Sequence, residues 1–167
     1  MIGRYGQILK YVPVLAPQNI TSTATGTNAV KLGGCHRLTY EVQFGSVTAT
    51  STDQNVVITV LASSVATTNT GTAIAFNYRV SGAVGTDTWG AITAATASGA
   101  SIAPATANNA LVLIDIDPAV ALNGPTSLDG AYTELVITPD AGATATNVSV
   151  VAHIEPRYIQ TSPVSAS

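Results

Sequence analysis

Hydrophobic and polar residues alternate along several short stretches of the chain. The clearest stretch is 36–44, in which apolar or aromatic residues at every second position alternate with polar ones. Successive side chains of a β-strand point to opposite faces, so this pattern predicts a strand with one buried face. Further strands are predicted where β-branched and aromatic residues gather, at 55–62, 73–80, 86–93, 110–116, 132–138 and 147–154, with a weaker strand at 28–32. The buried face of the strand predicted at 73–80 is left open.

The segments between these stretches are rich in Gly, Asn, Asp, Ser and Thr, which is typical of turns and loops. One helical signal occurs, because Asp117 can cap a single turn at 118–122 that begins with proline and is followed by Gly124. About eight short antiparallel strands with almost no helix predict an all-β domain, namely an antiparallel β-sandwich with a jelly-roll-like topology. A closed barrel is the alternative architecture.

The chain divides into an extended N-terminal arm at 1–18, a β-sandwich domain at 19–155 and a short polar C-terminal tail at 156–167. Proline fixes φ and removes a backbone donor, so Pro13 and Pro17 favour an extended arm over a helix. Apolar and aromatic residues of the arm need a surface to cover, either on their own domain, as an edge strand, or on a neighbouring subunit. The anchor residues predicted for a partner are Tyr5, Ile8, Leu9, Tyr11 and Val12.

Composition narrows the range of partners. The 167 residues are 46% hydrophobic but only 9% charged, with a net charge of −3, whereas ordinary soluble domains carry roughly 25% charged residues. Lys and Arg form no cluster, so binding to nucleic acid is not expected. No run of about 18 apolar residues is present, so we expect no membrane span. Polar residues interrupt the apolar N-terminus, which argues against a signal peptide and predicts synthesis in the cytoplasm.

Residues that commonly carry catalysis or hold metals are few. His36 and His153 both lie in predicted strands, and no G-x-S-x-G nucleophile elbow is present. Cys35 is the only cysteine, so the chain can form no internal disulfide, and with the two histidines it falls short of the four ligands of a structural zinc site. We therefore expect a protein without catalytic residues, metal or cofactor, and not an enzyme.

Two weaker alternatives concern ligands. Asp115, Asp117 and Asp129 could supply oxygen ligands to Ca²⁺, although Asp117 is explained as a helix cap and Asp115 as the point where a strand reaches solvent. Trp89 is a possible ligand contact, because an exposed indole beside polar residues can stack on a sugar ring. A lone Trp more often fills a core.

Three segments resemble small virion proteins of tailed bacteriophages: GRYGQILKYVPVL at 3–15, AFNYRVSGAVGTDTWG at 75–90 and VSVVAHIEPRY at 148–158. The resemblance implies a capsid decoration or cement protein with a β-sandwich fold, located on the capsid surface of the virion. It implies the major capsid protein as partner and assembly into a homotrimer. Some proteins of this type belong to the tail or fibres, so the alternative function is a carbohydrate- or receptor-binding module at that position.

Overall fold

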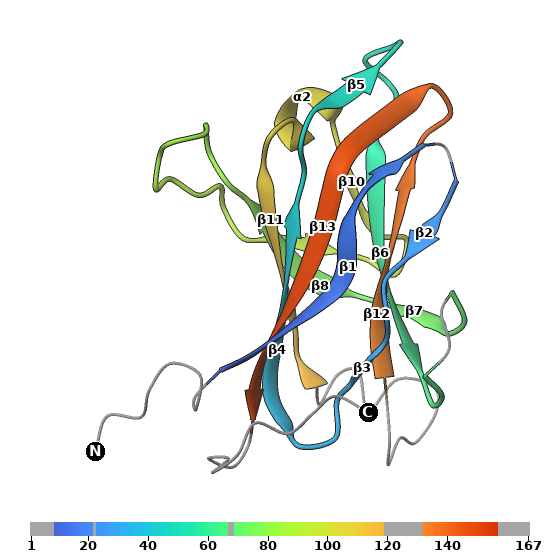
Figure 1. Cartoon of the computed structure of the whole chain (residues 1–167), viewed down its shortest axis with the longest axis vertical. Helices are drawn as coiled ribbons and strands as arrows, with labels where there is room; N and C mark the ends of the chain where they lie inside the picture. Colours follow the sequence, from blue (N-terminus) through green and yellow to red (C-terminus); the bar gives the residue numbers. More distant parts are fainter. Residues whose placement is uncertain (1–8, 22, 67–68, 119–131, 157–167) are drawn as a thin grey trace.

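The computed structural model describes residues 9–21, 23–66, 69–118 and 132–156. Within these residues the chain forms two antiparallel β-sheets that pack face to face as a sandwich (Figure 1). The first, sheet A, has seven strands. Its order across the sheet is β1 (Lys10–Ile20), β13 (Ala143–Pro156), β4 (Cys35–Gln43), β11 (Leu111–Ile116), β8 (Phe76–Val80) and β9 (Thr93–Ala95), while β5 (Val47–Ala49) pairs with β13.

Sheet B has six strands. Its order is β10 (Ala100–Ile102), β6 (Val56–Ser63), β12 (Tyr132–Pro139) and β2 (Thr25–Gly26), with β3 (Val30–Lys31) also paired to β12 and β7 (Thr72–Ile74) paired to β6. The chain passes repeatedly between the sheets, so that the last strand, β13, lies between β1 and β4. The order β1-β13-β4-β11 facing β2/β3-β12-β6-β7 is that of a jelly roll. The predicted all-β sandwich is confirmed.

The strand count was predicted too low, since the described residues contain thirteen strands and not eight. Most of the additional strands are two or three residues long and lie in segments predicted as loops, as β5 and β10 do. Helix α2 (Pro104–Ala107) also lies in such a segment, where proline occupies the start of the helix. Of the predicted helix at 118–122, Pro118 is helical and the other residues are outside the described part.

Two predicted strands need correction. The stretch 73–80 is two strands, because β7 belongs to sheet B and β8 to sheet A. Its large apolar residues lie at every second position, and Ile74 and Phe76 are both buried although they belong to different sheets. The stretch 86–93 is mostly loop, in which Trp89 forms only an isolated bridge with Ser81. Backbone hydrogen bonds from Gly82 to Thr88 and from Gly90 to Val80 close this loop instead of extending a ladder.

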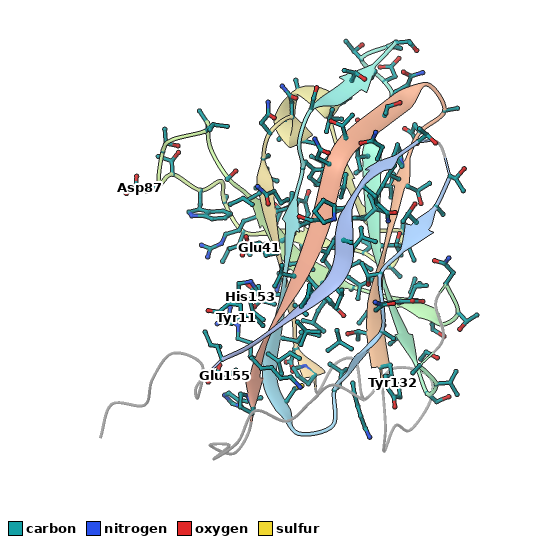
Figure 2. The ribbon with its side chains drawn as sticks, viewed as in Figure 1. Tyr11, Glu41, Asp87, Tyr132, His153 and Glu155 are labelled. Carbon is teal, nitrogen blue, oxygen red and sulfur yellow. The ribbon has the colours of Figure 1, made fainter. Side chains whose placement is uncertain are left out.

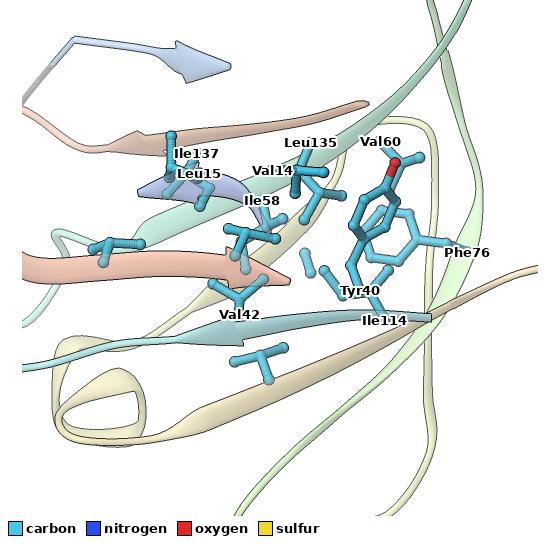
Figure 3. Close-up of a cluster of buried hydrophobic side chains, with 14 of the residues drawn as sticks. Val14, Leu15, Tyr40, Val42, Ile58, Val60, Phe76, Ile114, Leu135 and Ile137 are labelled. Carbon is cyan, nitrogen blue, oxygen red and sulfur yellow. The ribbon is translucent and has the colours of Figure 1, made fainter. Parts of the chain in front are cut away.

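The core lies between the two sheets (Figure 3). The predicted alternation of β4 is confirmed, because Leu38, Tyr40 and Val42 are completely buried and the residues between them face outward. Tyr40 spans the core, and its hydroxyl lies 2.9 Å from the carbonyl oxygen of Thr133 on sheet B. Full burial of one large aliphatic side chain contributes about 1.5–3 kcal/mol, so the interleaved Val, Ile and Leu side chains are the main source of stability.

β1 begins in the middle of the segment that was predicted as an arm. From Lys10 onward it forms an edge strand that pairs with β13 through a ladder interrupted by three register shifts. Val14 and Leu15 are buried in the core. The segment 10–18 is therefore part of the sandwich, whereas 1–8 lies outside the described residues. No helix in the described ranges is long and apolar enough to cross a bilayer.

Candidate functional site

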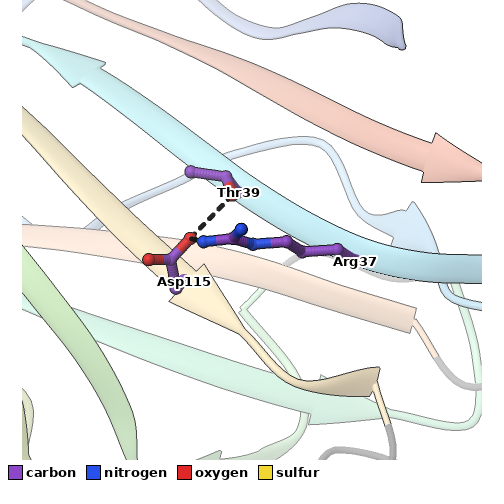
Figure 4. A network of polar contacts seen from close by, with 3 residues as sticks. All are labelled: Arg37, Thr39 and Asp115. Atoms are coloured by element: carbon purple, nitrogen blue, oxygen red, sulfur yellow. Dashed lines mark hydrogen bonds and ion pairs between the residues drawn. The ribbon is translucent and has the colours of Figure 1, made fainter. Parts of the chain in front are cut away.

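The outer face of sheet A carries both ion pairs found among the described residues. Asp115 on β11 lies opposite Thr39 on β4 in the strand register. Its Oδ1 atom accepts hydrogen bonds from the Thr39 hydroxyl at 2.8 Å and from the Arg37 guanidinium at 2.9 Å (Figure 4). Because the Arg37 side chain is 60% exposed, the ion pair contributes little to stability, of the order of 0–1 kcal/mol. These contacts explain Asp115 as a residue that links two strands.

Two of the three acidic residues considered for Ca²⁺ lie in the described part of the chain. Asp115 is engaged by Arg37 and Thr39, Asp117 is exposed beyond the end of β11, and Asp129 lies outside the described residues. In the part of the chain that the structure describes, no three His, Cys, Asp or Glu residues form a cluster suited to a metal ion.

His153 is held between two neighbouring strands (Figure 2). Its Nε2 atom lies 3.0 Å from Oε2 of Glu41 on β4, and its ring makes an edge contact with Tyr11 on β1, with 4.7 Å between ring centroids. This arrangement ties β1 and β4 to β13. His36 and Cys35 are adjacent in β4 and face opposite ways, since His36 is exposed and Cys35 is buried with its sulfur 3.4 Å from the Lys31 carbonyl oxygen. They do not converge on a common ligand.

Trp89 is not part of the core. It lies in the loop between β8 and β9, which projects from the sandwich and carries the labelled Asp87 (Figure 2). The Trp89 side chain is 38% exposed, and the Arg79 guanidinium lies 4.9 Å from its ring centroid. Val84 and Ile92 in the same loop are even more exposed. The loop therefore presents apolar surface that the domain itself does not cover.

The five predicted anchor residues are placed differently by the fold. Tyr11 is 44% exposed, while Val12 is half-buried against the core and Leu9 is half-buried just before β1. Tyr5 and Ile8 lie outside the described residues. Of the anchor residues that the structure describes, Tyr11 offers the largest exposed aromatic surface to a partner.

Sequence reasoning missed a groove on the outer face of sheet A. It has a volume of about 580 Å³ and lies at the end of the sheet near the Gly45 turn. Its walls come from β1, β13, β4, β11 and the β8–β9 loop, and they include Pro17, Gln43, Val84, Leu111 and Ser149. The residues are far apart in the sequence and none has a charged side chain. A motif search could not have found them.

Sequence reasoning also missed the burial of Glu134 on β12. The residue is 2% exposed, and its Oε1 atom accepts a hydrogen bond from the backbone N–H of Thr70 at 3.2 Å. Its Oε2 atom has no hydrogen-bond partner among the described residues. Burial raises the pKa of the Glu134 carboxyl, and the backbone N–H groups of Thr70 and Asn69 oppose that shift.

Comparison of the chain with protein-family models and with curated protein sequences gives no match. The described residues offer exposed apolar side chains in the β8–β9 loop, an uncharged groove, and β1 at the edge of sheet A.

Proposed function

We propose that this chain is a non-enzymatic structural protein of a tailed-phage virion, which decorates and stabilises the capsid through protein–protein contacts. The observation that carries the proposal is the position of β1. Among the described residues it is the outermost strand of sheet A, and its Tyr11 side chain is 44% exposed. The predicted anchor residues Tyr5 and Ile8 precede this strand in the sequence. The resemblance of three segments to phage virion proteins and the jelly-roll order, which is common in capsid proteins, support the same function.

The composition agrees with this role. With 9% charged residues, contacts to a shell would be mainly apolar and hydrogen-bonded, and such contacts are weakly screened by salt. A homotrimer that engages several capsid subunits at once would gain avidity, because the second and third contacts form at a high effective concentration. The proposed partners are thus the major capsid protein and two further copies of this chain.

The test is co-sedimentation of the protein with capsids of its own phage, with the copy number measured by mass. The full chain should bind at many copies per shell, and its mass in light scattering should be three times the 16.9 kDa of one chain. A variant that lacks residues 2–8 should keep the circular dichroism of the full chain and bind the shell at least tenfold more weakly. The truncation must end before Lys10, because Val14 and Leu15 belong to the core.

Unchanged shell binding by the truncated variant would contradict the role of the N-terminal segment. A few copies per virion would contradict capsid decoration and favour the second candidate, a carbohydrate- or receptor-binding module of a tail or fibre. The observation that favours this candidate is the exposed indole of Trp89. A glycan array should then show binding that Trp89→Ala abolishes.

A further inference from the structure

The groove on the outer face of sheet A has a rigid frame. The backbone N–H of Gly45 donates to the carbonyl oxygen of Thr146 at 3.0 Å, and the N–H of Asn109 donates to the carbonyl oxygen of Gly45 at 2.8 Å. The turn at Gly45 approaches β13 so closely that a Cβ atom on Gly45 would lie 2.6 Å from the Thr146 oxygen. Asn147 has a φ of 50° and locally interrupts the regular strand geometry of β13. The groove is therefore built into the backbone and does not depend on flexible side chains alone.

Hydrogen-bonding groups of the groove are available to a ligand. Gln43, Asn147 and Ser149 contribute two amide side chains and one hydroxyl, and none of the three side chains hydrogen-bonds to another described residue. An amide offers both a donor and an acceptor, and a hydroxyl does the same. Adjacent to these groups are the apolar side chains of Pro17 and Leu111.

The chemistry of the lining selects the class of ligand. The groove has no Lys, Arg, Asp, Glu or His, so a charged ligand would lose hydration without gaining a counter-charge. A purely apolar ligand would remove water from Gln43, Asn147 and Ser149 without replacing those hydrogen bonds. A neutral sugar carries no charge and still replaces the hydrogen bonds to water. Its hydroxyl groups can bond to the amides of Gln43 and Asn147, and its C–H surface can pack on Pro17 and Leu111. The volume of about 580 Å³ lies within the range of roughly 300–1,000 Å³ for small-molecule sites.

We propose that this groove binds a neutral saccharide. The proposal goes beyond capsid decoration, because a protein fixed to a shell could hold cell-surface or soluble glycans on the exposed face of sheet A. It also differs from sugar stacking on Trp89, which does not line the groove.

The experiment is an NMR titration of the full chain with maltotriose, lactose and triacetylchitotriose as neutral probes and trigalacturonate as the anionic probe. At least one neutral probe should produce saturable shifts of backbone amides at Gln43, Leu111 and Ser149, and trigalacturonate should not. Gln43→Ala and Ser149→Ala should each raise the Kd of that probe about tenfold, which corresponds to about 1.4 kcal/mol. The matched control is Asn77→Ala, an exposed residue on the same sheet and outside the groove, which should leave the Kd unchanged.

Several results would overturn the proposal. They are the absence of saturable shifts with all three neutral probes, equal or tighter binding of trigalacturonate, and binding that Trp89→Ala abolishes while Gln43→Ala and Ser149→Ala leave it intact. Shell co-sedimentation separates this proposal from the capsid role. If the two groove variants bind sugar weakly and capsids normally, the groove is a saccharide site, whereas loss of capsid binding would identify it as a protein contact.

Discussion

Replacing Glu134 with Gln should stabilise the protein at neutral pH. The carboxyl lies on the outer face of sheet B but is 2% exposed, because the segment 69–71 approaches it from the β6–β7 connection. In Glu134→Gln the side-chain oxygen can still accept the hydrogen bond from the Thr70 N–H and the buried negative charge disappears, while the NH2 group takes the place of Oε2, which has no partner among the described residues. A buried charge costs several kcal/mol and an unpaired amide about 1–3 kcal/mol, so the substitution should raise the free energy of unfolding by a net of about 1–2 kcal/mol. For a chain of this length that gain raises the Tm by about 2–8 °C.

The pH dependence distinguishes this cause from better packing. Since the folded-state pKa of Glu134 is raised above its ordinary value of 4.5, the folded protein holds the proton more tightly than the unfolded chain does. In the wild-type protein, binding of this proton stabilises the fold fully below the pKa of the unfolded state, and this stabilisation is lost as the pH rises through the folded-state pKa. The advantage of Glu134→Gln should therefore be largest at pH 7 and disappear toward pH 4.

Urea denaturation of both proteins at several pH values between 4 and 8 measures this difference. Asp87→Asn is the matched control, because it removes one negative charge from an exposed loop and should change stability by less than about 0.5 kcal/mol. Glu134→Ala should destabilise the protein by about 1–3 kcal/mol, since it leaves the Thr70 N–H without its acceptor. A Glu134→Gln protein that is less stable than wild type at pH 7, or whose advantage does not change with pH, would refute the reasoning.

Three further substitutions, one of them with a matched control, test the core and the frame of the groove. Tyr40→Phe should lower the free energy of unfolding by about 1–3 kcal/mol, because it removes the hydroxyl that bonds to Thr133. A denaturant titration that shows no difference in the free energy of unfolding would contradict a stabilising role of that hydrogen bond. Ile58→Ala should cost about 2–5 kcal/mol because Ile58 is fully buried, whereas the exposed Ile92→Ala should cost less than about 0.5 kcal/mol, and equal effects would contradict the assigned core. Gly45→Ala should lower the Tm by several degrees, because its Cβ atom would lie only 2.6 Å from the Thr146 oxygen and the backbone would have to shift. An unchanged Tm in thermal unfolding would contradict the rigid backbone contact at Gly45.

The strands that alternate regularly were predictable, and the physical reason is burial on one face. In β4, Leu38, Tyr40 and Val42 contact the core and Arg37 and Thr39 contact solvent, so local sequence and global packing agree. Short strands such as β5 and β10 have no such signal. Each contains only three residues, and each is formed by pairing with a strand that is remote in sequence. Their existence depends on the completed fold and not on local preference.

The change of sheet near Ala75 shows a second limit of sequence reading. Two strands that belong to different sheets can follow each other with a single residue between them, as β7 and β8 do at Ala75. The alternation continues through this change of sheet, because Ile74 and Phe76 are two positions apart and both are buried, one on each sheet. A regular alternation therefore does not tell whether the chain stays in one sheet or crosses to the other.

The groove could not be predicted because its chemistry is ordinary at every single position. Gln43, Asn147 and Ser149 are residues that the sequence explains equally well as solvent-facing strand positions. What makes them a site is register: Ser149 lies opposite Gln43, and Gln43 lies opposite Leu111, so three strands place their outward side chains in one row. That row becomes concave where β1 brings Pro17 to one side and the β8–β9 loop brings Val84 to the other. A charged site can be recognised in a sequence because it uses rare residues at short spacing. The residues of this uncharged groove are common and come together only through the order of the strands.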